Sequence, residues 1–143
     1  MNFVSLDDLP KKIPIFPLTG AVLFPKTQLP LNIFEPRYVQ MLNAALATPQ
    51  KLIGMVQPNS GDDGSLKKVG CVGRVTSYNE TDDHRYLITL NGIIRFEIEN
   101  ELDTTTQYRQ VEVNYENFIT DLKSEDVTNV DRESLLKLIK KYL

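Results

Sequence analysis

Few residues in this chain have the types and spacing that chemistry requires. The single histidine, His84, follows Asp82 and Asp83 in a polar stretch, and three such side chains could contact a divalent cation. The stretch supplies no further ligands at the spacing of a known metal site, so we interpret His84 as a surface turn residue and predict no metal. We also predict no cofactor, because neither of the glycine-rich phosphate-binding patterns occurs in the sequence.

A serine nucleophile paired with a lysine is the second candidate for chemistry. The pattern Ser-x-x-Lys occurs with Ser65 and Lys68 and again with Ser134 and Lys137. The companion motifs of the enzymes that use this pattern are missing, and so short a pattern often arises by chance. We therefore predict that the chain is not an enzyme, and keep an unrecognised hydrolase as an alternative. Cys71 lies among valines and glycines and is predicted to be a small core residue.

Composition and charge indicate a folded domain that stays in the cytoplasm. The chain has 143 residues, with 41% hydrophobic and 24% charged residues, which is globular composition. One cysteine suits a reducing compartment, and no stretch approaches the roughly 18 apolar residues of a membrane span. The net charge is -3 and the basic residues are scattered, so we expect no nucleic-acid partner.

The elements that would position these residues are mostly short strands. Prolines interrupt the apolar runs of residues 12–33, which excludes a helix there. A helix is predicted from Pro36, because apolar residues follow at the spacing of one helical face: Tyr38, Met41, Leu42, Ala45 and Leu46. Later alternation predicts further strands, including two that meet in a turn at Asn91 and Gly92. The expected fold is mainly β with α: about six short strands in a small barrel, with one inserted helix.

The alternating pattern ends near residue 118, which suggests two regions. Residues 1–120 are predicted to form the β domain, and residues 121–143 an acidic linker followed by an amphipathic helix that begins a helical subdomain. One stripe of this helix is apolar and would allow a homodimer through it: Leu135, Leu138, Ile139, Tyr142 and Leu143.

Four stretches together resemble a known family. They are "IPIFPLTGAVLFPKTQLPLNIFEPRYVQML", "GCVGRV", "YLITLNGIIRFEI" and "YRQVEV". From about Ile13 to Phe118 the chain is similar to the Lon protease N-terminal, or substrate-binding, domain, in particular to the stand-alone bacterial form without the ATPase and protease modules. The resemblance implies a PUA-like pseudo-barrel followed by a helical region.

The resemblance also implies a function. We expect a non-catalytic module that binds unfolded or tagged polypeptide in connection with proteolysis or protein quality control, with a separate ATPase or protease as a further partner. RNA binding is the alternative, because related barrels bind RNA, although the acidic net charge speaks against it.

The corner "IFEPRY" supplies the predicted site residues. We expect Phe34 and Tyr38 to anchor the helix, Pro36 to start it, and Glu35 to carry charge favourable to its N-terminus. Arg37 could pair with a carboxylate from a neighbouring strand. Phe34, Glu35, Arg37 and Tyr38 could also border a groove for peptide, and they are the candidate substrate-binding residues. Phe24, an aromatic residue at a junction between apolar runs, is expected to pack in the core. No catalytic residue is predicted.

Overall fold

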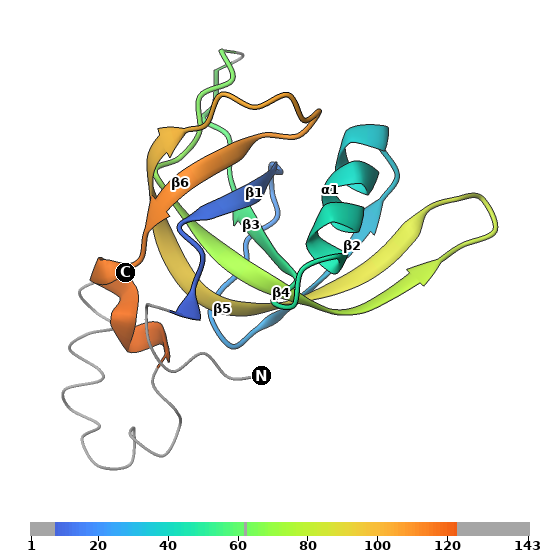
Figure 1. Ribbon diagram of the computed structural model, residues 1–143, viewed down its shortest axis with the longest axis horizontal. Coiled ribbons are helices and arrows are strands. Elements are labelled where there is room, and N and C mark those ends of the chain that lie inside the picture. The colour runs from blue at the N-terminus through green and yellow to red at the C-terminus, as the bar shows by residue number, and fades with distance from the viewer. Residues whose placement is uncertain (1–7, 62, 123–143) are drawn as a thin grey trace.

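The computed structural model describes residues 8–61 and 63–122 (Figure 1). These residues form six strands, one α-helix and a 3-10 segment, in agreement with the predicted fold class. Their order is β1 (Lys12–Pro17), β2 (Gln28–Ile33), α1 (Pro36–Leu46), β3 (Leu52–Val56), β4 (Val69–Glu80), β5 (Tyr86–Glu101), β6 (Gln110–Asn114) and η2 (Glu116–Leu122).

The strands form one sheet that closes on itself. The strand order is β2-β5-β4-β3-β1-β6, and β5 also pairs with β6, so five strands make a ring. Strand β5 closes this ring because it is long: its first half pairs with β2, and its last residues pair with β6. The β4–β5 hairpin, flanked by β2, extends beyond the ring as an arm (Figure 1). Closure removes most of the unpaired strand edges that an open sheet would expose.

Strand β5 continues through Asn91 and Gly92 without a turn, so the predicted turn at this position is wrong. The backbone of the loop between β1 and β2 packs directly on Gly92. The Gly92 N–H donates to the Thr27 carbonyl at 2.8 Å, and the Gly92 carbonyl accepts from the Lys26 N–H at 2.9 Å. A Cβ at residue 92 would lie 1.9 Å from the Phe24 carbonyl oxygen. Glycine is therefore needed here for a close backbone approach and not for a turn.

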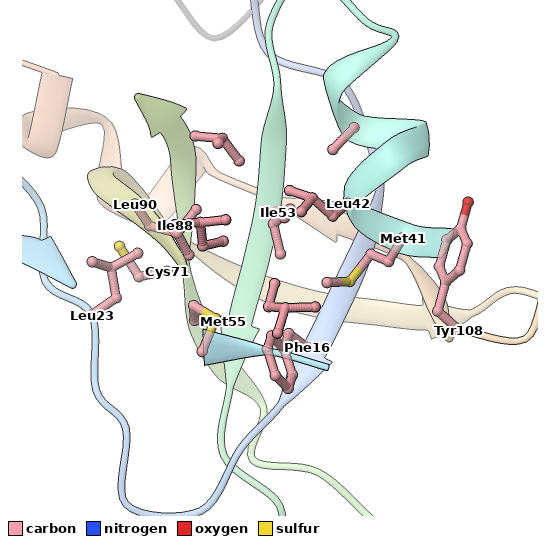
Figure 2. Close-up of a cluster of buried hydrophobic side chains, with 13 residues drawn as sticks. Phe16, Leu23, Met41, Leu42, Ile53, Met55, Cys71, Ile88, Leu90 and Tyr108 are labelled. Carbon is pink, nitrogen blue, oxygen red and sulfur yellow. The ribbon is translucent and has the colours of Figure 1, made fainter. Parts of the chain in front are cut away.

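Two clusters of buried side chains make the core. The first lies within the ring, receives residues from all five of its strands and includes the fully buried Phe96. The second lies between α1 and the sheet, with residues from strands β1 to β5 (Figure 2). Helix α1 supplies Met41, Leu42 and Ala45 to it, which confirms the predicted helical face. Leu23, from the β1–β2 loop, lies at the end of this cluster remote from α1 (Figure 2).

The described chain ends on a segment fixed to the barrel. Asp121 of η2 accepts hydrogen bonds from the Arg95 backbone N–H at 3.0 Å and from its guanidinium at 3.0 and 2.8 Å. The predicted helix of the last residues, its apolar stripe, the homodimer and the pair Ser134 and Lys137 lie outside the described residues. Within residues 8–61 and 63–122, the structure contains no helix with the length and apolar character to cross a membrane.

Candidate functional site

An apolar groove of about 510 Å³ lies between the β1–β2 loop and the β3–β4 part of the sheet. Its lining comes from the loop, from β3 and the residues after it, from β4 and the residues before it, and from β5. The lining residues are Ala21, Val22, Leu23, Phe24, Met55, Val56, Gln57, Lys67, Lys68, Val69, Gly70, Cys71 and Arg95. A pocket of this size and composition suits apolar side chains of a ligand.

The loop wall of the groove presents two large apolar side chains to solvent. Val22 is 49% exposed and Phe24 is 59% exposed, whereas Leu23 between them is 5% exposed and packs in the core. A tight turn holds the wall: the Thr27 hydroxyl donates to the Phe24 carbonyl at 2.7 Å, and Lys26 has a φ of 64°. Loop residues 22 and 24 therefore point outward because Leu23 anchors the segment.

The floor of the groove comes from adjacent strands. Met55 of β3 and Cys71 of β4 are opposite each other in the register, and both are buried. Val69, two residues before Cys71 in β4, is 44% exposed at the mouth. Burial raises the pKa of the Cys71 thiol to about 12, so the thiol stays protonated and adds no charge to the apolar floor.

Native Cys71 is expected to resist alkylation. Because the thiolate is the reactive form, iodoacetamide should modify the folded protein at a rate on the order of 100-fold or more below that of the urea-unfolded chain at the same pH. Mass spectrometry of quenched samples measures both rates. Equal rates would show that the thiol is exposed and ionised, contrary to the burial in this structure.

Cations border the groove. The backbone of residues 67 and 68 is fixed, since the Lys67 N–H donates to the Gln57 carbonyl at 2.8 Å and the Lys68 carbonyl accepts from the Ile98 N–H at 2.8 Å. The Lys68 ammonium lies 3.1 Å from Glu97. Arg95 is held by Asp121 and lies over the Phe118 ring, with 4.8 Å from its guanidinium carbon to the ring centroid.

The predicted site residues lie together at the start of α1, and the groove is lined by other residues. Tyr38 stacks on Phe16 with ring centroids 4.2 Å apart, which agrees with its expected anchoring role. Phe34 is 56% exposed and lies against Arg85, so it does not anchor the helix. Arg37 pairs with Glu35 at 3.0 Å and not with a neighbouring strand. Pro36 occupies the start of the helix, as predicted.

The residues considered for chemistry have other partners. The Ser65 hydroxyl donates to Asp63 at 2.7 Å, while Lys68 pairs with Glu97, so Ser65 and Lys68 do not form a nucleophile–base pair here. His84 lies in the exposed β4–β5 turn, with its Nδ1 atom 3.5 Å from a Glu80 carboxylate oxygen. No group of three or more metal-ligating side chains occurs in the part of the chain that the structure describes.

Comparison with known proteins identifies the family. The model of the ATP-dependent protease La (LON) substrate-binding domain matches residues 12–143. The chain belongs to this family. A Lon protease of Parabacteroides distasonis is 32% identical over 133 residues, which is 90% of this chain and 15% of that protein. Lon protease 2 of Sorangium cellulosum is 32% identical over 93 residues, 62% of this chain and 12% of that protein.

Solved structures of the LON family share the fold. The Lon N-terminal domain protein from Xanthomonas campestris superimposes with a TM-score of 0.61 at 24% identity, covering 73% of this chain and 59% of that one. The N-terminal domain of the Mycobacterium avium complex Lon protease gives 0.61 at 15% identity, covering 73% and 54%. In length, the chain spans about an eighth of the curated Lon proteases that it matches in sequence. The family description connects it with substrate binding in proteolysis.

Sequence reasoning missed the groove residues Val22, Phe24 and Val69. Phe24 was expected in the core, and its 59% exposure shows that expectation to be wrong. One signal was available: "AVLF" is an apolar run that lies between a glycine and a proline and outside any strand pattern. Apolar residues in a loop either pack beneath it or form an exposed patch, and here they do both.

Proposed function

We propose that this LON-family chain is a non-catalytic module that binds unfolded or extended polypeptide, and that the groove receives its apolar side chains. The observation that carries the proposal is the exposure of Val22, Phe24 and Val69 around a buried apolar floor. An unfolded protein exposes apolar side chains that a folded protein buries, so such a groove distinguishes the two states. A separate ATPase or protease would then act on the polypeptide that the module holds.

Weak and sequence-tolerant binding follows from these contacts. Burying an apolar side chain fully contributes about 1.5–3 kcal/mol, and the loop residues are already half-buried before a ligand arrives. The gain from each is therefore about 1 kcal/mol, which suits a module that must bind many sequences and release them.

Phe24→Ser is expected to weaken binding of a reduced and alkylated, permanently unfolded protein about five- to tenfold in Kd, because it removes the largest exposed apolar side chain of the groove. The folded form of the same protein should not bind. Fluorescence anisotropy measures the affinities, and urea unfolding shows whether each variant is folded.

Phe34→Ser tests the helix corner and should weaken binding less than Phe24→Ser. Tyr78→Ser is the matched control, since Tyr78 is 59% exposed, as Phe24 is, and does not line the groove. A loss confined to Phe34→Ser would assign binding to the helix corner. Wild-type affinity in the Phe24 variant would remove the groove from the proposal.

The corner residues Phe34, Glu35, Arg37 and Tyr38 are proposed as a secondary contact. Strand pairing places Asn32 opposite Leu87, so these two side chains lie on the same face of the sheet. Phe34 follows Asn32 by two residues, and the exposed Phe34 and Leu87 therefore share the outer face of the arm. Of these four residues, Phe34 would contribute apolar contact. Glu35 and Arg37 already pair with each other, and Tyr38 is engaged with Phe16.

A further inference from the structure

The charged residues that line the groove all have the same sign. They are Lys67, Lys68 and Arg95, and the described lining includes no Asp or Glu, although the whole chain has a net charge of -3. The charged groups in the groove lining are therefore opposite in sign to the net charge of the chain.

Two of these cations have carboxylate partners, and those partners lie outside the groove lining. Glu97 pairs with Lys68 at 3.1 Å, and Asp121 pairs with Arg95 at 2.8 Å. Lys67 has no carboxylate partner within residues 8–61 and 63–122. The Lys68 side chain is 72% exposed, so a ligand carboxylate can reach it without displacing Glu97.

Backbone hydrogen bonds fix the main chain at these two lysines before any ligand arrives. The bonds from Lys67 to Gln57 and from Ile98 to Lys68 fix this segment between the extension of β3 and the strand β5. Val69, which follows directly, is half-exposed at the groove. Apolar contact and positive charge are therefore adjacent in one short, ordered segment, so a single extended ligand can engage both.

We propose, on the basis of the proposed function, that the groove prefers extended polypeptide in which Asp or Glu residues flank the apolar side chains. The apolar residues occupy the space between Phe24 and Val69, and the flanking carboxylates lie at Lys67 and Lys68. RNA fits less well, because the groove presents one aromatic side chain, Phe24, for base stacking and a floor of aliphatic and sulfur-containing groups.

The test uses three synthetic peptides that share the core Leu-Val-Phe-Leu and carry Asp, Ser or Lys pairs at both ends. We expect the Asp-flanked peptide to bind about fivefold more tightly than the Ser-flanked one, and the Lys-flanked peptide to bind more weakly than both, because exposed ion pairs each contribute modestly. The difference should shrink as salt is raised. Fluorescence anisotropy with labelled peptides measures each Kd.

A charge-matched pair of variants assigns the preference to the groove. The double variant Lys67→Gln and Lys68→Gln should make the Kd values of the Asp- and Ser-flanked peptides equal. The double variant Lys11→Gln and Lys12→Gln changes the net charge equally at two adjacent exposed lysines that do not line the groove, and it should leave the preference intact.

The two proposals fail in different ways. Equal binding of all three peptides to the wild-type protein would overturn the charge preference and leave polypeptide binding intact. Binding of none of them would overturn the proposed function and the preference with it. Displacement of the Asp-flanked peptide by a single-stranded RNA oligonucleotide at the same concentration would overturn the assignment of the cations to acidic polypeptide.

Discussion

Gly92→Ala is expected to destabilise the protein by about 3 kcal/mol and to lower its Tm by roughly 10 °C. The added Cβ would lie 1.9 Å from the Phe24 carbonyl oxygen and 2.7 Å from the Phe24 carbonyl carbon, and both are backbone atoms that no side-chain rotation can move. The β1–β2 loop must shift outward instead. Two hydrogen bonds of Gly92, to Thr27 and Lys26, then weaken together with the contact.

Urea unfolding measures the effect as a lower midpoint with an unchanged m-value. The control is Gly61→Ala, because a Cβ at residue 61 meets Asp63 at an ordinary 3.7 Å and should be tolerated. The displaced loop carries Phe24, so the Gly92 variant should also bind unfolded protein more weakly while still folded. Wild-type stability in this variant would mean that the loop does not pack on β5.

Asp121→Ala is expected to destabilise the protein by about 2–3 kcal/mol. The Asp121 side chain is 8% exposed and accepts three hydrogen bonds from Arg95, one from its backbone and two from its guanidinium. Removing the carboxylate leaves the partly buried Arg95 without this neutralising partner. It also releases η2 from β5 and loosens the contact between Arg95 and Phe118.

The matched control is Glu101→Ala. It also removes a carboxylate that forms two hydrogen bonds with an arginine, but the side chains of Arg109 and Glu101 are 35% and 47% exposed. Water replaces such a pair readily, so the expected cost is at most about 1 kcal/mol. Thermal unfolding of both variants at low and high salt distinguishes the two ion pairs. Raising the salt should reduce the loss of stability in Glu101→Ala more than in Asp121→Ala, because salt weakens the exposed pair more than the buried one. Equal losses would contradict the structural role given to Asp121.

The prediction at Asn91 and Gly92 shows where sequence patterns stop being informative. This dipeptide between apolar alternations is typical of a hairpin turn, and the local pattern offers no sign that another segment packs there. The glycine serves a contact with Phe24, which is distant in sequence.

The site residues show the same limit for side chains. Phe24 and Phe34 were both expected to pack in the core because large aromatic residues usually do, yet both are more than half exposed. Arg37 was expected to reach a neighbouring strand, and it pairs with Glu35 two residues away. Residue type gives the tendency to be buried, while the burial itself depends on which surfaces remain uncovered after the elements pack.

The sequence by itself determined the mainly β class, the helix that starts at Pro36, the buried helical face and membership of the LON family. These properties follow from alternation, helical spacing and motifs that are local in the chain. The tertiary structure alone decided that β5 closes the ring, that Leu23 anchors a loop whose neighbours stay exposed, and that cations from β5 and the segment before β4 border one groove. Each of these depends on contacts between segments distant in sequence, which no local pattern encodes.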